Sequence, residues 1–501
     1  MPSIHKVLVA NRGEIAARII RSLKEMNIAT VAIYSEADRT APHVMLANQA
    51  VCIGKAPSSE SYLNQQNIVD VCLELQVDAV HPGYGFLSEN ADFADLTEQN
   101  GIIFIGPSRE SIEVMGSKIK AKEAVAGYNI PLVPGTTEPV TPGPHAQEQA
   151  AAVGYPLLIK ASAGGGGKGM RVVEAAEEFD SQLQRASSEA LSAFGDGSVF
   201  IEKFITEPRH IEVQILGDQH GNIVHLYERE CSIQRRHQKV IEEAPSTAIS
   251  AQLRQQLGQA AVDVAKAAGY YGAGTVEFML DQHKNFYFLE MNTRLQVEHP
   301  ITEMITGIDL VKEQVRVAEG KKLPFDQGDI KITGHAIEAR VYAEDPSNNF
   351  LPDTGKLHYY QIPRGPGVRV DDGYYQGMEV PIYYDPMIAK LIVHGKNRVE
   401  AIQRMIRSID EYRVVGLKTT LDFCRFVMQH PKFEQGDYNT GFVGEHYRPE
   451  EGQNLNQETQ EVAAAFAAYI SSQKKSSSQN HTGNQSSDSA WRSRAKDAWN
   501  G

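Results

Sequence analysis

Cysteine is scarce in this chain of 501 residues, and its positions exclude the common cysteine-based sites. The four cysteines, Cys52, Cys72, Cys231 and Cys424, lie far apart, and no CxxC pair occurs. This pattern excludes a zinc ribbon and argues against a disulfide framework. We therefore expect buried structural thiols rather than metal ligands or nucleophiles.

Long apolar runs and an excess of positive charge are also missing. The chain has no run of about 18 apolar residues, and its N-terminus, MPSIHKVLVANRG, has no apolar signal-peptide segment. We therefore expect a cytoplasmic protein that does not enter a membrane. The formal net charge of −14 argues against a nucleic-acid partner, although local basic pockets for small anions remain compatible with it.

Two familiar glycine-rich nucleotide motifs are absent. The first predicted strand is followed by NRGE (11–14) instead of G-x-G-x-x-G, which disfavours a Rossmann-type dehydrogenase. The glycine run SAGGGGKG (162–169) has no Ser or Thr after Lys168, so it is not a Walker A loop. Because it joins predicted strands at 155–161 and 170–174, its amides could cover phosphates beside Lys160. A flexible hairpin tip is the alternative.

What is present divides the chain into regions. Over residues 1–115, predicted strands at 6–10, 30–34, 79–81 and 102–105 alternate with predicted helices at 14–26 and 66–75. This alternation indicates a doubly wound parallel sheet. A helix with Lys118, Lys120 and Lys122 precedes a small α/β module at 130–203, and a mixed α+β region with antiparallel strands extends to about 450.

The last 51 residues, 451–501, differ in composition from the rest. An Ala-rich helix is expected at 457–470, followed by a polar, disordered segment at 471–489. Both tryptophans, Trp491 and Trp499, follow this segment. They indicate either a docking segment that folds on a partner or a frayed end without a role.

The segment NFYFLEMNTRLQVEHP (285–300) carries the strongest functional signal. If residues 286–298 are extended, one face carries Glu290, Asn292, Arg294, Gln296 and Glu298. The other face carries Leu289, Met291, Leu295 and Val297. A hairpin closed at His283 and Lys284 would place Glu277 of a strand at 274–280 opposite Glu290. Facing carboxylates repel unless a cation such as Mg²⁺ or Mn²⁺ lies between them, whereas a one-residue shift would turn one of them to solvent.

Taken together, these features resemble the ATP-grasp superfamily, and more closely the biotin carboxylase component of acyl-CoA and pyruvate carboxylases. The resemblance spans about residues 3–447. It rests on ANRGEIAARI (10–19), HPGYGFLSEN (81–90), FIGPS (104–108), GGGGKGMR (164–171), ERECSIQRRHQKVIEEAP (228–245), FLEMNTRLQVEHPITE (288–303), GHAIEARVYAEDP (334–346) and YYDPMIAKLI (383–392). One departure is Ser117 before Lys118, where the family often has Asp.

The resemblance implies a fold in four parts. These are an N-terminal α/β domain at 1–115, an ATP-grasp region at 116–330 that includes a lid module at 130–203, a mixed C-terminal domain at 331–450, and the tail at 451–501. The fold class implied is therefore α/β and α+β, with a doubly wound parallel sheet at the N-terminus.

The resemblance also implies roles for individual residues. Lys118 and Lys160 would hold the ATP phosphates under a lid that contains Gly165, Gly166 and Gly167. Glu202 and Lys203 would flank adenine, with three further side chains near the nucleotide: His210, Gln234 and His237. Two Mg²⁺ (or Mn²⁺) ions would be held by Glu277, Glu290 and Asn292.

Bicarbonate and biotin would bind beside this metal site. The implied bicarbonate ligands are Lys239, Arg294, Gln296 and the backbone of Val297. Glu298 would act as the general base, and Arg340 would stabilise the biotin enolate. Tyr84 would border biotin, or it is simply a packed aromatic residue in a turn.

The implied reaction is the ATP- and bicarbonate-dependent carboxylation of biotin, with ADP as a product. No biotin-acceptor lysine between methionines and no carboxyltransferase-sized region are found, so we expect a separate biotin carrier protein, a carboxyltransferase subunit and a homodimer. Acetyl-CoA carboxylase of fatty acid biosynthesis is one expected setting, and the sequence does not distinguish acetyl-CoA, propionyl-CoA and pyruvate as the final acceptor. Another ATP-grasp ligase and a non-catalytic nucleotide-binding subunit are the alternatives.

Overall fold

The structure is a computed structural model that describes residues 3–449, except 129, 137, 142, 162–169, 195 and 237, together with Ala465. Two compact units are distinguished, residues 1–447 and 448–501, and the description below concerns the first. The predicted tail helix, polar segment and tryptophan pair lie outside the described residues, apart from Ala465. Among the described residues, no helix combines the length and apolarity that crossing a membrane requires.

The N-terminal region forms a five-stranded parallel sheet, as the alternating pattern predicts. Its strand order is β3-β2-β1-β4-β5, with bounds β1 Lys6–Val9, β2 Ala29–Ser35, β3 Gln49–Gly54, β4 Ala79–His81 and β5 Ile103–Phe104. The helices are α1 Gly13–Glu25, α2 Pro42–Leu46, α3 Gln65–Glu74, α4 Ala91–Gln99 and α5 Arg109–Gly116. Short 3₁₀ turns occur at Glu36–Asp38 and Ser58–Glu60.

Alternation along β1 explains why helices cover both faces of this sheet. Val7 and Val9 pack with Ile19 of α1, whereas Leu8 between them packs with Ile68 of α3. Strand β3 was not predicted because its sequence, QAVCIG, lies at the sheet edge and is mostly exposed or half-buried. The doubly wound parallel sheet is thus confirmed, with one edge strand added.

The next region contains a small module with its own core. Strands β6 Leu157–Ala161, β7 Met170–Val173 and β8 Val199–Lys203 form an antiparallel sheet in the order β7-β6-β8. Helices α7 Pro144–Val153 and α8 Ala176–Phe194 accompany it, and α6 Lys118–Val125 precedes it. Ile159, Phe179 and Leu183 belong to one apolar cluster confined to the module. The predicted strand at 198–201 extends to Lys203 and therefore includes Glu202.

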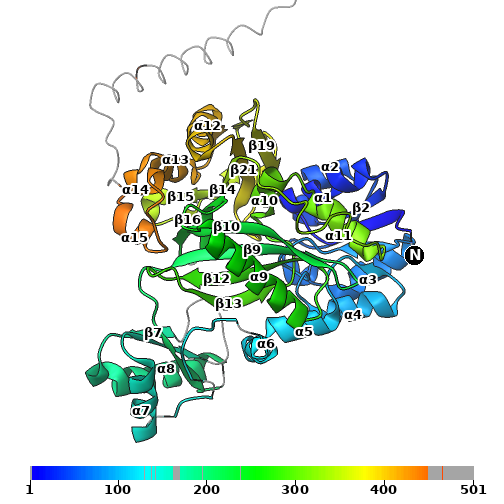
Figure 1. The fold of residues 1–501 in the computed structure, drawn as a ribbon. Helices are drawn as coiled ribbons and strands as arrows, with labels where there is room; N and C mark the ends of the chain where they lie inside the picture. Colours follow the sequence, from blue (N-terminus) through cyan, green and yellow to red (C-terminus); the bar gives the residue numbers. More distant parts are fainter. Residues whose placement is uncertain are drawn as a thin grey trace, which may run out of the picture. The chain divides into compact units, whose positions relative to one another are not determined.

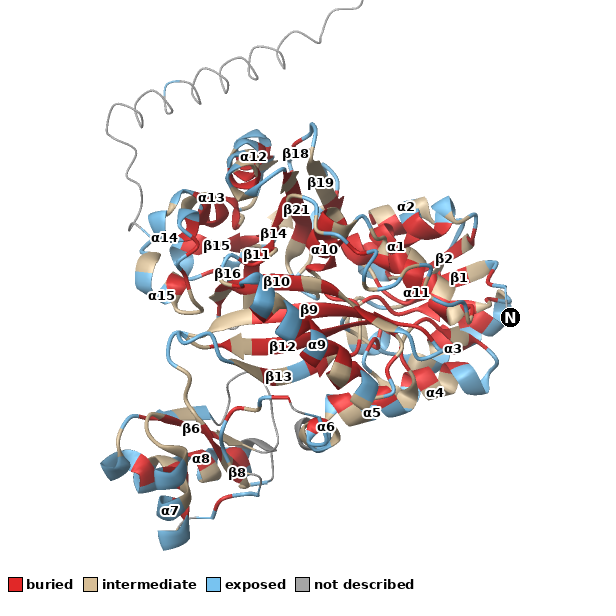
Figure 2. Ribbon diagram, viewed as in Figure 1, coloured by how far each residue is buried: buried red, intermediate tan, exposed pale blue. Residues whose placement is uncertain are grey.

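The largest sheet has eight antiparallel strands in the order β13-β12-β9-β10-β11-β14-β21-β19. Their bounds are β9 Arg209–Gly217, β10 Ile223–Arg235, β11 Gln238–Ala244, β12 Gly272–Leu280, β13 Phe286–Asn292, β14 His335–Tyr342, β19 Val368–Asp372 and β21 Met387–Gly395. Figure 1 shows β9, β10, β12 and β13 side by side, with α9 Ala251–Ala267 across them. Figure 2 shows that buried residues are concentrated along these strands.

The remaining elements cover the sheet or extend its C-terminal part. The helices are α10 His299–Thr306, α11 Leu310–Ala318, α12 Arg398–Glu411, α13 Leu421–Gln429, α14 Pro431–Glu434 and α15 Phe442–His446, with a 3₁₀ turn at Pro346–Asn348. The short strands are β15 Glu344–Asp345, β16 Leu351–Pro352, β17 Gly355–Lys356, β18 Tyr359–Gln361, β20 Glu379–Val380 and β22 Arg413–Val415. Ile337, Leu391 and Met405 represent the apolar core that joins β14, β21 and α12.

The predicted hairpin between β12 and β13 is present, but its second strand is shorter than predicted. The backbone N–H of Asp281 donates to the Asn285 carbonyl at 2.9 Å and Leu280 pairs with Phe286, so the turn is centred on His283 and not between His283 and Lys284 as predicted. A register shift between Phe278 and Glu277 then places Glu277 opposite Glu290. Strand β13 ends at Asn292, so the prediction of extended chain over residues 293–298 is wrong. The chain turns there because Glu298 is the N-cap residue of α10, and Pro300 in the first turn suits a helix start.

Candidate active site

The carboxylate of Glu277 in β12 is the meeting point of the predicted metal and anion ligands. Its Oε1 accepts hydrogen bonds from Lys239 Nζ at 3.0 Å, Asn292 Nδ2 at 3.0 Å and Gln296 Nε2 at 2.8 Å. His210 Nε2 lies 3.0 Å from its Oε2. Burial alone would raise the pKa of Glu277, but the adjacent Lys239 and His210 lower it well below its usual range. Glu277 is thus held as a carboxylate.

The surroundings of Glu277 fit a hard divalent cation. His210, Glu212 and Glu277 offer ligand atoms that all lie within 4.8 Å of one another. Glu290 is the partner of Glu277 across the ladder, so the predicted pairing is confirmed, and Glu290 is the exposed member of the pair. The predicted ligands Glu277, Glu290 and Asn292 would supply carboxylate and amide oxygens, which are the donors that Mg²⁺ prefers.

Lys239 in β11 contacts three buried carboxylates at once. Its Nζ lies 2.5 Å from Glu212 Oε2, 3.0 Å from Glu277 Oε1 and 2.7 Å from Glu298 Oε1. Burial would lower the pKa of Lys239, but these three negative charges raise it well above its ordinary value. The side chain is therefore a fixed cation at the centre of the site.

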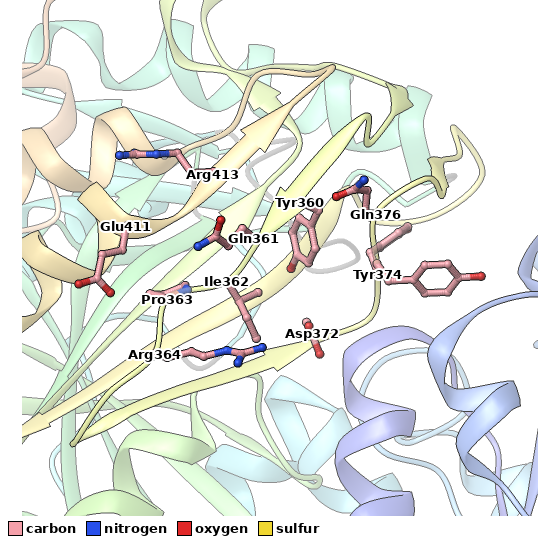
Figure 3. A pocket seen from close by; sticks show the side chains of 11 residues that line it. Tyr360, Gln361, Ile362, Pro363, Arg364, Asp372, Tyr374, Gln376, Glu411 and Arg413 are labelled. Carbon is pink, nitrogen blue, oxygen red and sulfur yellow. The ribbon is translucent and has the colours of Figure 1, made fainter. Parts of the chain in front are cut away.

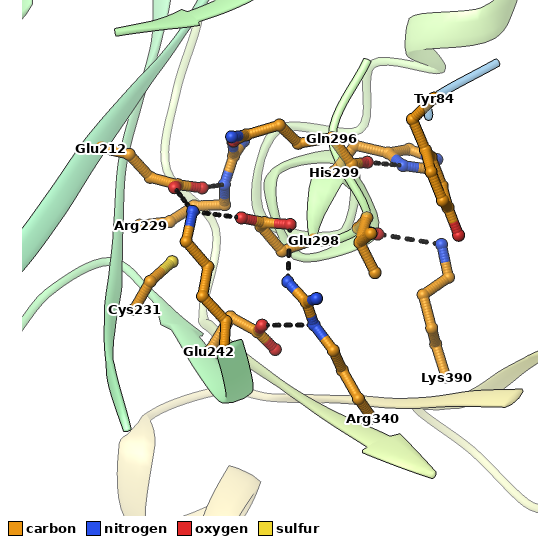
Figure 4. Close-up of polar contacts among 12 residues, drawn as sticks. Tyr84, Glu212, Arg229, Cys231, Glu242, Gln296, Glu298, His299, Arg340 and Lys390 are labelled. Atoms are coloured by element: carbon orange, nitrogen blue, oxygen red, sulfur yellow. Dashed lines mark hydrogen bonds and ion pairs between the residues drawn. The ribbon is translucent and has the colours of Figure 1, made fainter. Parts of the chain in front are cut away.

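Glu298, the predicted base, contacts both Lys239 and Arg340. Figure 4 shows its contact with Arg340. Arg340 Nη2 donates to Glu298 Oε2 at 2.9 Å, and its Nε donates to Glu242 Oε1 at 2.7 Å. Burial would raise the pKa of Glu298, but Lys239, Arg340 and Arg229 lower it well below its usual range. The structure thus brings the two residues predicted for proton removal and enolate stabilisation into direct contact.

The predicted bicarbonate ligands Arg294 and Val297 have other partners. Arg294 Nε donates to Glu89 Oε2 at 2.7 Å, and its Nη2 donates to Asn292 Oδ1 at 3.0 Å. The Val297 carbonyl accepts a hydrogen bond from Lys390 Nζ at 2.9 Å. The predicted bicarbonate ligands therefore bind two different carboxylates. Lys239 and Gln296 donate to Glu277, and Arg294 donates to Glu89.

Tyr84 reaches the same region through Glu14 and Lys390. Its hydroxyl hydrogen-bonds to Glu14, and Lys390 Nζ lies 3.2 Å from Glu14 Oε2 and 5.9 Å from the centre of the Tyr84 ring. Because Lys390 also contacts the Val297 carbonyl, Tyr84 is connected to the segment that carries Glu298. The packing of Tyr84 and its predicted place beside biotin are compatible.

On the nucleotide side, Glu202 is an acceptor shared by two lysines. Lys122 Nζ donates to Glu202 Oε1 at 2.7 Å, and Lys160 Nζ donates to Glu202 Oε2. Lys203 instead donates from its Nζ to the carbonyl of Tyr155 at 2.7 Å, and its backbone N–H donates to the Pro134 carbonyl at 2.7 Å. The Lys203 amide is therefore already bonded.

Of the remaining predicted nucleotide ligands, the structure describes only the side chain of Gln234. Gln234 Nε2 donates to the Cys231 carbonyl at 2.8 Å. Gly165, Gly166, Gly167, His237 and the side chain of Lys118 lie outside the described residues.

A separate surface pocket of about 750 Å³ lies in the C-terminal region (Figure 3). Tyr360, Arg364, Tyr374 and Arg413 are among the residues that line it. None of the residues predicted from the sequence lines this pocket. The residues predicted for base and anion binding gather instead around Lys239 and Glu298.

Comparison with known proteins agrees with this arrangement. Three family models match the chain: the N-terminal domain of biotin carboxylase at residues 3–112, the ATP-binding domain of the carbamoyl-phosphate synthase L chain at 117–325, and the biotin carboxylase C-terminal domain at 338–445. A biotin carboxylase from Nostoc sp. is 52% identical over 440 residues, which are 88% of this chain and 98% of that protein. The chain belongs to the biotin carboxylase family.

Other members of the biotin carboxylase family extend the comparison. The mouse mitochondrial methylcrotonoyl-CoA carboxylase subunit alpha is 51% identical over 447 residues, or 89% of this chain, and the match spans 62% of its length. A solved dimer of the biotin carboxylase domain of Hydrogenobacter thermophilus 2-oxoglutarate carboxylase, in complex with MgADP, ADP and bicarbonate, is 47% identical with a TM-score of 0.84. It covers 89% of this chain and 98% of that chain. The predicted family and fold class are thus confirmed.

Sequence reasoning missed several residues that build this biotin carboxylase-family site, and Arg229 is the foremost. Arg229 is fully buried, and its guanidinium donates to Glu212 Oε1 at 2.5 Å and to Gln296 Oε1 at 2.8 Å. It also donates to Gln214, Thr275 and Thr302. The one available signal was its place in the ERECSIQRR motif, because an arginine between two glutamates in a strand is unusual for an apolar face.

Proposed function

We propose that the chain is a biotin carboxylase, which uses ATP and bicarbonate to carboxylate biotin on a separate carrier protein, with carboxyphosphate as an intermediate. The observation that carries this proposal is the direct contact of Glu298 with both Lys239 and Arg340. A carboxylate held between two cations can accept a proton while those cations bind an anionic reactant. The proposal makes the protein an ADP-forming, ATP-dependent ligase.

Bicarbonate would bind where Lys239 and Gln296 now contact Glu277. Lys239 offers a point charge, and Arg294 offers a planar guanidinium that can bind a small oxyanion through two N–H groups. Arg294 would exchange its contact with half-exposed Glu89 for bicarbonate, which costs little because exposed ion pairs are weak. The Val297 backbone would complete this pocket.

ATP would bind between Lys160, Lys118 and the glycine-rich segment 162–169, with Glu202 and Lys203 beside adenine and with His210, Gln234 and His237 nearby. Glu277, Glu290 and Asn292 would hold Mg²⁺ or Mn²⁺, which when bound neutralises charge on the triphosphate. The Hydrogenobacter thermophilus relative supports this assignment, since its solved structure is a complex with both MgADP and bicarbonate.

The proposed reaction begins with removal of the bicarbonate proton by Glu298. The bicarbonate oxygen then forms a bond to the γ-phosphorus of ATP while the bond to ADP breaks, which produces carboxyphosphate. Carboxyphosphate breaks down to CO₂ and phosphate, and the phosphate removes the N1′ proton of biotin. The resulting enolate, stabilised by Arg340 and bordered by Tyr84, attacks CO₂.

The low pKa of Glu298 agrees with this sequence of steps. Lys239 and Arg340 are the main charges that lower this pKa. A bound bicarbonate anion would neutralise part of the positive charge that Lys239 presents to Glu298. The pKa of Glu298 would then rise towards the value that a base needs.

The proposed setting is an acyl-CoA carboxylase complex, in which the chain works as a homodimer with a biotin carrier and a carboxyltransferase subunit. Support comes from the mouse relative, a carboxylase subunit alpha, and from the Hydrogenobacter dimer. Because the match spans only 62% of the mouse protein, the whole assembly, its acyl acceptor and a fatty acid biosynthesis role belong to the proposal. The four-part division and a cytoplasmic location are proposed on the sequence alone.

The test is ADP release by the purified chain with ATP, Mg²⁺, bicarbonate and either free biotin or a biotinylated carrier. A biotin carboxylase releases more ADP when biotin is added and transfers label from [¹⁴C]bicarbonate to biotin. An ATP-grasp ligase with another acceptor would show no response to biotin. A nucleotide-binding subunit would bind ATP without turnover, and either result would overturn the proposal.

A further inference from the structure

Two carboxylates face each other directly behind the proposed catalytic residues. Glu242 in β11 and Glu338 in β14 are paired residues of neighbouring antiparallel strands. Directly opposed residues project to the same face of a sheet, where two like charges repel. Both side chains are completely buried, with 0% of their surface exposed. Water therefore does not screen the repulsion, and at least one of the two carboxyl groups has a strong reason to be neutral.

The hydrogen bonds of the two residues are unequal. Arg340 Nε donates to Glu242 Oε1 at 2.7 Å, whereas Glu242 Oε2 has no partner among the described protein groups. Neither carboxyl oxygen of Glu338 has a partner among those groups. A buried carboxylate without a donor is far more costly than a buried neutral acid. The neutral form is thus favoured most strongly at Glu338.

The charge of the whole cluster leads to the same result. Its cations are the buried Arg229, Arg340 and Lys390 and the half-buried Lys239, and its buried carboxyl groups are Glu14, Glu212, Glu242, Glu277, Glu298 and Glu338. If every carboxyl group were charged, the site would carry excess negative charge before bicarbonate or ATP arrived. A neutral Glu338 leaves four cations facing five carboxylates, which reduces this excess before an anion arrives.

The titratable groups around the pair come from several elements. They are Glu212 of β9, Cys231 of β10, Lys239 of β11, Arg340 and Tyr342 of β14, Glu298 at the start of α10, Lys390 of β21 and Cys424 of α13. Burial raises the pKa of Glu242 to about 7, although Arg340 opposes this shift. Burial also raises the pKa of Glu338 well above its ordinary value. The next residue on the opposite face of β11, Glu243, has a pKa of about 2, because burial is outweighed there by His335 and Arg398.

We propose that Glu338 is a neutral carboxylic acid in the working protein and that Glu242 is a positioning residue, whose negative charge holds Arg340 in its contact with Glu298. The role of Arg340 towards biotin rests on the proposed function, whereas the neutral state of Glu338 does not. When Glu242 is charged, it fixes Nε of Arg340 and leaves Nη2 directed at Glu298. When Glu242 takes up a proton, Arg340 loses its second anionic anchor.

The first experiment measures the protonation of Glu338 by infrared difference spectroscopy of the full chain at pH 7. Wild type minus Glu338→Gln should show the C=O stretch of a neutral carboxylic acid and no carboxylate band. The matched control, Glu243→Gln, should show a lost carboxylate band instead. A carboxylate band in the Glu338→Gln difference would overturn the proposal. So would a failure of this variant to fold, because a neutral amide of nearly the same shape should replace a neutral acid.

The second experiment compares the pH profiles of wild type and Glu242→Gln for biotin-dependent ADP release. At about pH 6 the two profiles should coincide, since Glu242 then carries a proton in wild type. At about pH 8.5 the variant should lose roughly tenfold or more in kcat/KM for biotin, as for loss of a hydrogen bond to a charged group, while the KM for ATP stays unchanged. Parallel profiles at all pH values would overturn the positioning role.

The two experiments separate this inference from the proposed function. If wild type releases no ADP in response to biotin, the proposed function fails, whereas the infrared measurement still decides the state of Glu338. If wild type is active and the infrared difference shows a carboxylate, the function stands and the inference fails.

Discussion

Lys239 Nζ lies 2.7 Å from Glu298 Oε1, so the ammonium proposed to bind bicarbonate already holds the carboxylate proposed to take its proton. The same ammonium also contacts Glu212 and Glu277. A bound bicarbonate would therefore lie between its cation and its base, within reach of both. This relationship joins substrate binding and proton removal in one contact.

We expect Glu298→Gln to keep ATP binding and to lose bicarbonate-dependent ATP cleavage by about a hundredfold or more, because an amide cannot accept the proton. ADP release and calorimetric ATP titration measure the two effects. Glu303→Gln is the control, since Glu303 is a buried carboxylate in the same helix region that pairs with Arg18 and leaves the base in place. Equal rates for wild type and Glu298→Gln would exclude the general-base role.

We expect Arg340→Ala to harm biotin carboxylation far more than nucleotide affinity. Arg340 contacts Glu242, Glu298 and Tyr342, and none of these three is a predicted nucleotide ligand. Loss of a charged hydrogen-bond donor that acts on developing negative charge costs roughly 10²–10³-fold in rate. Steady-state kinetics with biotin, together with ATP titration, checks this expectation. A large rise in the ATP dissociation constant would contradict it.

Local patterns in the sequence predicted much of the frame of this site. Period-2 alternation and a turn-forming segment predicted the hairpin of β12 and β13, because a hairpin depends on residues close in sequence. The predicted turn was displaced, however, and Glu277 lies opposite Glu290 because of an irregularity between Glu277 and Phe278 that no pattern in the sequence indicated. Apolar stripes in the first hundred residues likewise predicted the parallel sheet and α1. These features depend on neighbours within a few residues, which a single sequence contains.

The contacts between distant segments could not be predicted in the same way. Strand β13 ends at Asn292, where Glu89, about two hundred positions earlier, accepts hydrogen bonds from the Thr293 backbone N–H and from Arg294. Arg229 joins residues from four separate segments, and Lys390 reaches Val297 from β21. The tertiary fold determines these partners, and the hydrophobic periodicity of a single strand does not predict them.

Arg229 should be the most demanding buried cation in the protein to replace. A lysine at this position has three donors instead of five, so acceptors such as Gln296 and Glu212 would lose their partners. Arg229 donates to five side chains, so a lysine leaves at least two buried acceptors without a donor, and we expect Arg229→Lys to lower the free energy of unfolding by about 2–5 kcal/mol. Urea unfolding measures the loss.

Arg316→Lys is the matched control for this measurement, because the Arg316 side chain is 44% exposed and pairs with Glu313 at the surface of α11. We expect a change near zero for this control. If Arg229→Lys were no more costly than Arg316→Lys, the buried guanidinium would not organise the site.

Glu243 should make the stability of the fold depend on pH in the acidic range. Burial would raise its pKa, but hydrogen bonds and charge from His335 and Arg398 lower it from 4.5 to about 2. Because the folded state binds the proton less tightly than the unfolded chain, Glu243 contributes stability above about pH 4.5. This contribution, on the order of 3 kcal/mol, is lost as the pH falls towards 2.

The comparison of wild type with Glu243→Gln tests this dependence through urea unfolding at a series of pH values. The variant should be less stable at pH 7, and the gap in unfolding free energy should narrow steadily below about pH 4.5, since wild-type Glu243 then gains a proton. The same change at exposed Glu445 serves as the control and should leave a gap near zero throughout. The difference in unfolding free energy between wild type and Glu243→Gln could instead stay constant from pH 7 down to about pH 2. That result would mean that packing of the side chain, rather than its charge beside His335 and Arg398, supplies the stability.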